Sequence, residues 1–300
     1  MNAASTLMRG WATATLAAVT LITATGCATD DPEPDPAPNP DVQTVEVAFS
    51  ATVGADAFAC GQTYTGLGAS NSDLTLNDAR IYVHDVRLVD AAGNEIPLTV
   101  EDDGKWQQGG VVLLDFEDGT SGCADTGNAD VNTIVRGTVP AETDVSGFNG
   151  VRFVLGVPFD LNHANAATAA APLNLTAMWW NWNSGYKYVR VEGASTGLDS
   201  WRFHLGATMC DGDMAGNVTS CANPNRAEVA LEGFDPTTRP VVFDLAEMLA
   251  GVDLETNTMD TPPGCMAGPS DPDCAPYFEN LGLPFDGASA GAQRAFRAAN

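Results

Sequence analysis

The feature that most constrains the fold is a succession of short runs in which apolar and polar residues alternate. Alternation with a period of two predicts strands with one buried face, and many short strands at regular spacing predict a sandwich or barrel. The predicted strands cover 45–51, 79–89, 95–98, 111–116, 132–139, 150–157, 201–206, 227–231 and 240–245. Helix is expected only over 244–250, with Asp244 as its cap, and near 288–299. We therefore predict an all-β sandwich or barrel-like domain with a few short helices.

Residues 1–26 have the composition of an export signal. One charged residue, Arg9, precedes an Ala- and Thr-rich apolar stretch that is too short and too weakly apolar to span a membrane. The stretch ends in Ala24-Thr25-Gly26-Cys27, which resembles a bacterial lipobox, so we expect Cys27 to carry lipid. Ala28 after this cysteine favours the outer membrane, whereas a plain signal peptide would give a periplasmic or secreted protein.

A linker rich in Pro and Asp is predicted over 27–44. Its prolines favour a stiff, extended chain and its acidic residues repel one another, so it would hold a domain away from a membrane. The folded domain is expected over 45–283 and a C-terminal tail over 284–300.

The six cysteines that follow Cys27 predict disulfides, because an even set in an exported chain is typical of a disulfide framework. Six cysteines allow 15 pairings. Cys210 and Cys221 flank one polar loop, and Cys265 and Cys274 flank another, which favours local pairing and leaves Cys60 with Cys123. Thiolate binding of a metal is the alternative, but the sequence has no Cys-x-x-Cys motif.

The charge balance excludes several classes of function. The chain has 39 acidic and 13 basic residues, a formal net charge of −26. Nucleic acids and anionic membrane surfaces bind clustered Lys and Arg, so neither is an expected partner. The charge suits a cation or a basic protein, or solubility alone. The sequence also lacks the Gly-x-Ser-x-Gly and His-Glu-x-x-His motifs of common hydrolases.

The most unusual stretch is the tryptophan-rich segment 178–192. Three of the six tryptophans of the chain fall within four residues, and the pattern predicts a strand, a turn at Ser184-Gly185 and a second strand. In an extended strand Met178, Trp180 and Trp182 would share one face. Such a stretch is also typical of a sandwich core, because aromatic side chains supply large buried areas.

The chain has only three histidines, His84, His163 and His204. His84 lies within a predicted strand between Tyr82 and Val86, His163 follows a turn, and His204 lies on the strand face opposite Phe203. Each alone is more often a structural residue than a ligand. Together with Met178 they form a mixed imidazole and thioether set, which suits copper.

Several segments together resemble the MbnP family of exported copper-binding proteins, also called four-Cys-motif metallo-mystery-pair proteins. The matching stretches are Phe58–Tyr64 with Cys60, Arg80–Leu88, Leu113–Asp118 with Cys123, Gly156–His163, Pro172–Leu175, Met178–Lys187, Phe203–Gly206 with Cys210, Gly264–Met266 and Asp271–Cys274. The resemblance covers about residues 45–283, and the tail after Leu283 has no counterpart.

This resemblance implies a function that the composition alone does not. Family members are partners of a di-haem c-type cytochrome of the MbnH type, which oxidises a tryptophan to kynurenine, and the modified protein then binds one copper ion. Transferred to this chain, the oxidised residue is Trp180 or Trp182, and the ligands come from His163, His204, His84 and Met178. The implied role is copper acquisition or handling by a protein that is not itself an enzyme.

Two other functions remain open at this point. A surface lipoprotein could bind carbohydrate by stacking Trp179, Trp180, Trp182 and Tyr186 on sugar rings, which requires these aromatic rings to be exposed in a row. A structural envelope lipoprotein would have no ligand. Bound copper and a modified tryptophan would distinguish the first function from these two.

Overall fold

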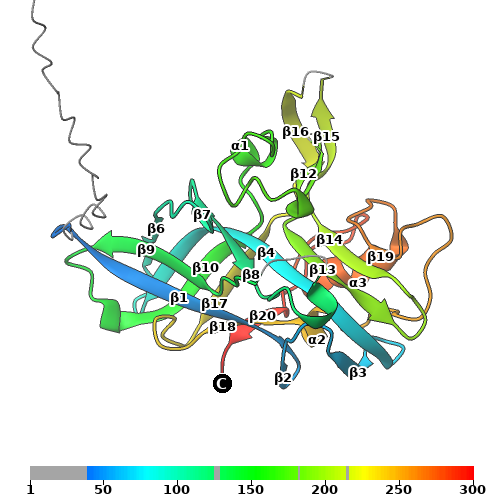
Figure 1. Cartoon of the computed structure of the whole chain (residues 1–300). Coiled ribbons are helices and arrows are strands. Elements are labelled where there is room, and N and C mark those ends of the chain that lie inside the picture. The colour runs from blue at the N-terminus through cyan, green and yellow to red at the C-terminus, as the bar shows by residue number, and fades with distance from the viewer. Residues whose placement is uncertain (1–38, 125–128, 182, 214–215) are drawn as a thin grey trace, which may run out of the picture. The chain divides into compact units, whose positions relative to one another are not determined.

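A computed structural model describes residues 39–124, 129–181, 183–213 and 216–300. The predicted lipid site at Cys27 and one oxidation candidate, Trp182, lie outside these ranges. Most of the described chain is strand, and the few helices are short. The predicted all-β class is therefore confirmed, as a sandwich of open sheets and not a closed barrel (Figure 1).

The smaller of the two main sheets has six strands and includes both ends of the described domain. In spatial order it consists of β20 (Phe296–Ala298), β18 (Val241–Asp244), β1 (Val42–Val53), β9 (Ile134–Pro140) and β6 (Thr99–Val100), and β2 (Asp56–Ala57) pairs with β1. The β1–β18 pair is parallel, whereas β1–β9 and β18–β20 are antiparallel. Two of the partners of β1, β9 and β18, are distant from it in sequence, whereas β2 follows it directly.

The larger sheet has ten strands and is organised around β4 (Ser72–Asp90), its longest member. Its main order is β17 (Ala227–Glu232), β10 (Phe148–Leu155), β4, β13 (Val189–Ser195), β14 (Trp201–Leu205) and β19 (Gly264–Cys265). The strands β3 (Thr63–Leu67), β5 (Glu95–Pro97) and β8 (Val111–Asp115) also pair with β4, and β7 (Gln107–Gln108) pairs with β8.

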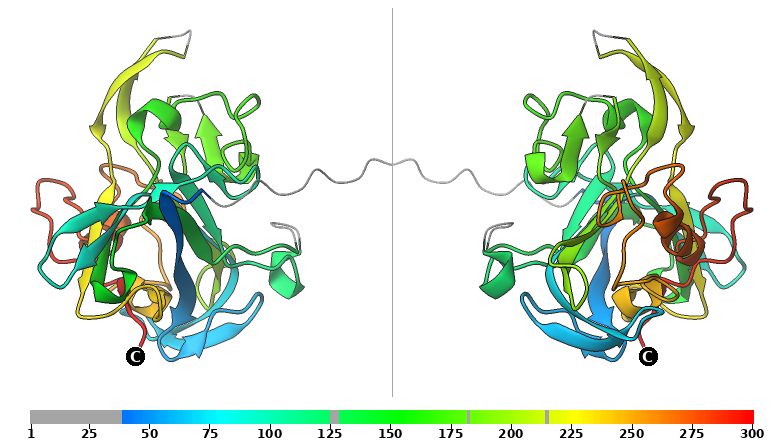
Figure 2. Two further views of the ribbon diagram at one scale, coloured as in Figure 1. Left: turned by 90° about the vertical axis from the view of Figure 1, so that its left-hand side faces the viewer. Right: turned by 90° about the vertical axis from the view of Figure 1, so that its right-hand side faces the viewer.

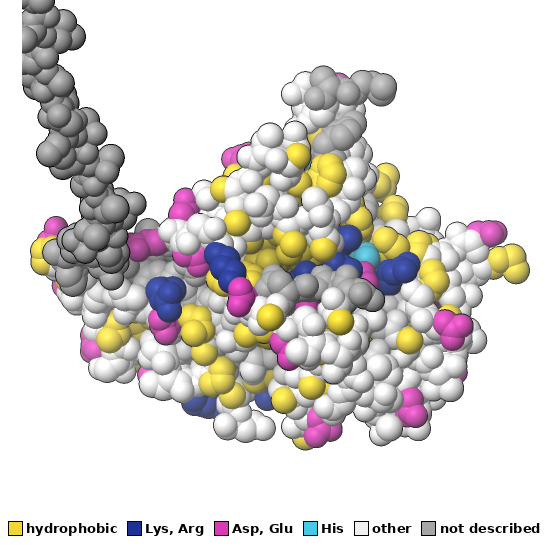
Figure 3. Space-filling view, viewed as in Figure 1, with side chains coloured by type: hydrophobic (Ala, Val, Ile, Leu, Met, Phe, Trp, Pro, Cys, Tyr) yellow, Lys and Arg dark blue, Asp and Glu magenta, His cyan; other side chains and the backbone are white. Residues whose placement is uncertain are grey.

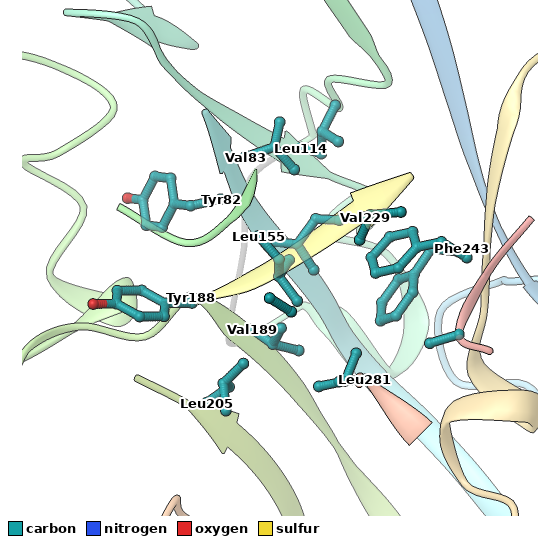
Figure 4. Close-up of a cluster of buried hydrophobic side chains, with 14 of the residues drawn as sticks. Tyr82, Val83, Leu114, Leu155, Tyr188, Val189, Leu205, Val229, Phe243 and Leu281 are labelled. Atoms are coloured by element: carbon teal, nitrogen blue, oxygen red, sulfur yellow. The ribbon is translucent and has the colours of Figure 1, made fainter. Parts of the chain in front are cut away.

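Aromatic rings join the two sheets in the core. Phe153 of β10 lies 5.5 Å from Phe49 of β1 and 5.3 Å from Phe296 of β20, both edge to face. Phe296 also stacks on Phe243 of β18 at 5.0 Å. Figure 4 shows Phe243 beside Val229 of the larger sheet. Rings of this size bury large apolar areas and prefer such contacts, so they hold the two layers together.

Two hairpins and a short helix project from one side of the sandwich (Figures 1 and 2). They are β11 (Trp179–Asn181) with β12 (Gly185–Tyr186), β15 (Thr208–Gly212) with β16 (Val218–Asn223), and α1 (Phe159–Asn162). Neither hairpin pairs with the two main sheets. The β11–β12 part of the tryptophan-rich segment therefore lies outside the two main sheets, whereas 189–192 belong to β13 of the larger sheet.

The predicted C-terminal tail belongs to the fold. The expected helix near 288–299 is wrong, because 296–298 form β20 and pair with β18. Phe296 is 2% exposed, so the burial of its ring in the core outweighs the helix preference of the alanines around it. The helix predicted over 244–250 is confirmed as α2 (Leu245–Met248), capped by the Asp244 side chain, which accepts the backbone N–H of Ala246. The third α-helix is α3 (Ala275–Asn280).

The three predicted disulfides are confirmed as Cys60–Cys123, Cys210–Cys221 and Cys265–Cys274. The first closes a loop of 63 residues onto the large sheet, and the other two close local loops of 11 and 9 residues. Within the described ranges, no helix is both long enough and apolar enough to cross a membrane.

Candidate metal centre

The tryptophan hairpin is closed by a side chain of its own first strand. Asn181, at the end of β11, accepts the backbone N–H groups of Asn183 and Ser184, each at 2.9 Å. Asparagine commonly closes turns in this way, because its side chain reaches backbone donors two or three residues ahead. The turn expected at Ser184-Gly185 is thereby confirmed, and Gly185 adopts a φ of 76° that favours glycine.

The strand begins one residue later than expected. Met178 lies in the 3-10 turn η3 (Thr176–Met178), so the prediction that it shares a strand face with Trp180 is wrong. The chain turns here because the Met178 backbone N–H donates to the Leu175 carbonyl. The Met178 side chain is fully buried among the core residues, so its thioether lies in apolar surroundings.

Asn162 fixes the hairpin to helix α1. Its Oδ1 accepts the Tyr186 backbone N–H at 3.0 Å, and its Nδ2 lies 3.3 Å from the Ser184 carbonyl. A Cβ atom at position 185 would lie 2.2 Å from the Asn162 carbonyl oxygen, so only glycine fits there. Asn162 is fully buried, and its hydrogen bonds place the following residue, His163, near the turn of the hairpin.

Trp180 of the hairpin lies beside His204 of β14. Their ring centroids are 6.3 Å apart. Gly206 gives the indole room, since a Cβ atom there would lie 2.5 Å from Trp180 Cζ3. The indole Nε1 of Trp180 and the Nδ1 of His204 are both buried, and neither has a hydrogen-bond partner among the described residues. Two polar atoms without partners at one place are typical of a functional site.

The charges around His204 determine its tautomer. His204 Nε2 lies 2.7 Å from Glu192 Oε1, and Arg190 contacts both oxygens of the same carboxylate, at 2.9 and 3.1 Å. Burial alone would raise the pKa of Glu192, but the hydrogen bonds from His204 and Arg190 lower it well below its usual value. Burial lowers the pKa of His204, and the positive charge of Lys187 adds to this effect.

The imidazole of His204 is therefore neutral and the Glu192 carboxylate is ionised. A carboxylate only accepts hydrogen bonds, so Nε2 carries the proton and Nδ1 keeps a free lone pair. Histidines that bind metals usually donate their other ring N–H to a carboxylate or carbonyl in this way. His204 thus has the hydrogen bonding of a metal ligand.

The register of the large sheet connects this histidine to a buried ionic network. Asp115 of β8 lies opposite Arg80 of β4, Arg80 opposite Arg190 of β13, and Arg190 opposite His204. Arg80 forms an ion pair with Asp78, and its Nη1 lies 3.6 Å from Glu117 Oε1. Figure 3 shows Lys and Arg side chains flanking a histidine at the base of the projecting elements.

The network was not predicted from the sequence. The available signal was the presence of charged residues inside apolar strands, such as Arg80 and Asp115, since unpaired charges are rarely buried. Burial raises the pKa of Asp115 to about 7, although the positive charge of Arg80 opposes the shift.

His84 occupies a separate environment. Its Nδ1 lies 2.8 Å from the Gly156 carbonyl oxygen, which can only accept, so Nδ1 carries the proton and Nε2 the lone pair. Burial lowers the pKa of this imidazole, so it is neutral. His84 is only half-buried, because Asp85 has a φ of 50° that interrupts the alternation of buried and exposed side chains along β4.

His163 follows α1 and lies against a disulfide. Its Nε2 is 3.6 Å from Cys221 Sγ and 3.3 Å from Asn162 Nδ2, and its ring contacts Phe159 edge to face. The structure thus brings His204 and His163 to the tryptophan hairpin through different elements, and it places His84 at Gly156.

In the described ranges, two groups of three His, Cys or acidic side chains have ligand atoms close enough to hold one ion. They are His163 with Cys210 and Cys221, and Glu117 with Cys60 and Cys123. Both contain a disulfide, and neither contains His84 or His204. The four predicted ligands therefore do not form a complete site from protein side chains alone.

The comparisons with known proteins agree with these features. The family model MbnP matches residues 42–267. The chain belongs to the MbnP family. Its structure is similar to that of MbnP from Methylosinus trichosporium, with a TM-score of 0.73 and 29% sequence identity over 86% of this chain and 99% of the other. No curated protein sequence matches. Membership in the MbnP family supports a methanobactin-related, copper-associated protein.

Proposed function

We propose that this protein is an exported copper-binding protein whose site is completed by oxidation of a tryptophan to kynurenine, and that Trp180 is the residue oxidised. The observation that carries the proposal is the contact between Trp180 and His204, each with a buried ring nitrogen that has no hydrogen-bond partner in the described part of the chain. The oxidant is a di-haem c-type cytochrome, as the family resemblance implies. The protein acts as a substrate of that partner and then as a metal carrier, without catalysing a reaction itself.

Kynurenine supplies ligands that the indole lacks. Transfer of four electrons from the indole to the cytochrome, with addition of two water molecules and release of four protons, opens the ring to N-formylkynurenine. Hydrolysis then releases formate and leaves a ketone and an aromatic amine. The oxidation produces polar groups at a place where His204 Nδ1 already presents a lone pair. An incomplete set of protein ligands is therefore expected before the modification.

His204 is the copper ligand with the strongest support, because Glu192 fixes its tautomer. A second imidazole comes from His163, which adjoins the hairpin through Asn162, or from His84, whose tautomer is fixed by Gly156. Imidazole suits copper, and a thioether favours Cu(I). Met178 remains a candidate, although its apolar burial gives it less support than the histidines have.

We further propose that the protein works in the cell envelope. The signal sequence ends at Cys27, so a lipid there would anchor the domain, most simply to the outer membrane, through the linker over 27–44. The acidic surface suits a protein that attracts cations or a basic partner, and it does not suit nucleic acid.

The carbohydrate-binding alternative receives little support. It requires a row of exposed rings, but Tyr186 is fully buried and its hydroxyl donates to the Leu173 carbonyl at 2.6 Å. Trp179 and Trp180 are only half exposed, and both indole nitrogens are buried. A sugar platform normally presents flat, accessible faces.

The decisive experiment is peptide mass spectrometry with copper analysis on protein purified from its native host. A tryptophan-to-kynurenine mass shift at Trp180, together with bound copper, is the expected result. Trp180→Phe should abolish both, whereas the matched control Trp179→Phe should retain both. A shift at Trp182 would keep the maturation but reassign the residue. Unmodified tryptophans without copper, in cells that express the cytochrome, would refute the proposal.

A further inference from the structure

His163 and the Cys210–Cys221 disulfide form a compact group of metal-binding atoms. The two cysteines lie directly opposite each other in the β15–β16 hairpin, which projects away from the main sheets (Figure 1). His163 Nε2 is 3.6 Å from Cys221 Sγ, and all three ligand atoms lie within 4.8 Å of one another. Two sulfurs and an imidazole nitrogen therefore already meet at one point, although they come from two separate parts of the chain.

The hydrogen bonds of Asn162 determine which nitrogen of the His163 ring carries the lone pair. Asn162 Oδ1 accepts the backbone N–H of Tyr186, so the Nδ2 amide faces His163 Nε2 at 3.3 Å. An amide nitrogen only donates, so Nε2 is the unprotonated nitrogen of the ring. A hydrogen bond of this length is weak and is readily replaced by a metal bond.

This disulfide is more accessible than the others. Cys210 and Cys221 are both half-buried, whereas Cys265 and Cys274 are fully buried and the third disulfide joins the half-buried Cys60 to the fully buried Cys123. A thiolate or phosphine must reach a sulfur atom to open a disulfide. Mild reduction is therefore expected to open Cys210–Cys221 before the other two.

We propose that Cys210, Cys221 and His163 form a redox-gated site for one thiophilic cation, Zn(II) or Cu(I). A dithiol transfers two electrons and two protons to the disulfide, giving two thiols, and is itself oxidised to a disulfide. The cation then binds the two sulfurs and His163 Nε2, and the two thiol protons are released to solvent. Transfer of two electrons from the two thiolates to a disulfide oxidant, which is reduced to two thiols, re-forms the Cys210–Cys221 bond, releases the cation and closes the site.

The ligand chemistry fits such a cation. Thiolate and imidazole are the preferred ligands of Zn(II), and thiolate also selects Cu(I). Ligand atoms on one tetrahedral zinc ion are roughly 3.5 Å apart, which follows from metal–ligand bonds of about 2.0–2.3 Å. The observed spacing needs only side-chain rotation to reach this arrangement, because the Cys221 and His163 atoms are already 3.6 Å apart. The fourth position would be open to water.

This site does not depend on kynurenine, so it is tested on unmodified protein made without the cytochrome. The full exported chain is treated with a phosphine under native conditions and its free thiols are counted. The phosphine is then removed anaerobically, and Zn²⁺ is titrated against a chromogenic chelator. Two thiols and one additional equivalent of zinc are expected, with a sulfur-to-metal charge-transfer band when Co²⁺ replaces Zn²⁺. The oxidised protein should show neither.

Three variants make the test specific. Cys210→Ser/Cys221→Ser should bind no additional zinc. His163→Gln keeps the disulfide but removes a metal ligand. Loss of a residue that only hydrogen-bonds to a ligand lowers metal affinity roughly tenfold, so His163→Gln should lower zinc affinity by more than that. Glu232→Gln, which changes a largely exposed carboxylate of β17, should bind zinc as the wild type does.

The proposal is wrong if the disulfide opens only when the protein unfolds, or if two thiols appear without additional zinc binding. It is equally wrong if His163→Gln binds zinc as tightly as the wild type. None of these results would affect the proposed tryptophan oxidation, which is measured by mass spectrometry on native protein.

Discussion

His204 and His163 adjoin the same tryptophan hairpin, but their surroundings differ in kind. His204 is held within the large sheet by an ionised carboxylate, Glu192, which is itself paired with Arg190. His163 is held by a neutral amide and lies against a disulfide on a projecting hairpin. The first arrangement sets a tautomer through charge and is insensitive to redox conditions. The second depends on the state of a covalent bond, so the two histidines can respond to different signals.

The largest effect is expected when one charge is removed from the ionic network that surrounds His204. Arg80→Leu removes the guanidinium that faces the buried Glu117 and leaves the buried Asp78 paired with Arg190 alone. Loss of one member of a buried pair costs about 3–5 kcal/mol, so we expect the free energy of unfolding in urea to fall by that amount. The matched control is Arg136→Leu, which breaks an exposed pair with Glu46 and should cost no more than about 1 kcal/mol. Equal effects would show that the network is not buried as described.

A smaller change would test the tautomer itself. Glu192→Gln keeps the shape of the side chain but removes the charge that orients His204. We expect copper affinity of the kynurenine-containing protein to fall about 10–100-fold, as it does when the outer partner of a metal ligand is lost. Nitrogen-15 NMR should also show loss of the fixed Nε2-protonated tautomer. Glu232→Gln, at a largely exposed carboxylate, should change neither measurement.

The packing of the hairpin can be altered without touching either histidine. In Gly206→Ala the new methyl group would lie 2.5 Å from Trp180 Cζ3 and 2.6 Å from the Tyr186 carbonyl oxygen. Overpacking of this kind costs about 1–3 kcal/mol, so thermal unfolding and tryptophan fluorescence should both shift. Gly291→Ala adds the same group in open space and should leave both unchanged. An unshifted fluorescence spectrum in Gly206→Ala would contradict the position of Trp180.

The smallest expected effect concerns the far end of the ionic network. Burial raises the pKa of Asp115 to about 7, well above its value in an unfolded chain. The folded state therefore binds more protons than the unfolded state between these values, so the contribution of Asp115 to stability is lost as the pH rises towards 7. The side chain in Asp115→Asn cannot ionise. The free energy of unfolding of this variant minus that of the wild type should therefore be larger at pH 8 than at pH 5. Denaturant unfolding at the two pH values measures the difference.

The control for this pH effect is Asp90→Asn. Hydrogen bonds from Asn94 lower the pKa of Asp90, so it is ionised in both states at pH 5 and at pH 8. Its difference from the wild type should not change over this range. If the difference in stability between Asp115→Asn and the wild type also stays constant from pH 5 to pH 8, then Asp115 titrates at an ordinary pH.

Many of the strands could be predicted from the sequence, because the alternation of apolar and polar residues along a strand is a local property. The strand over 79–89 was predicted within β4, and the turn at Ser184-Gly185 was predicted within the tryptophan hairpin. Predictions failed where distant contacts decide the outcome. The helix expected near 288–299 is a strand because Phe296 fills the core between Phe153 and Phe243. Met178 lies outside the predicted strand, because it belongs to a 3-10 turn in which its side chain is buried.

The sequence by itself determined the all-β class, the disulfide pairs and the set of histidines and tryptophans available for a metal site. These follow from local periodicity, cysteine spacing and composition, which need no knowledge of distant neighbours. Only the tertiary structure decided which histidine lies beside Trp180, which tautomer it adopts and which disulfide lies against His163. The physical reason is strand register, since the pairing of β4, β13 and β14 aligns Arg80, Arg190 and His204 across the sheet. The β4–β13 part of that register depends on contacts between residues more than 100 positions apart.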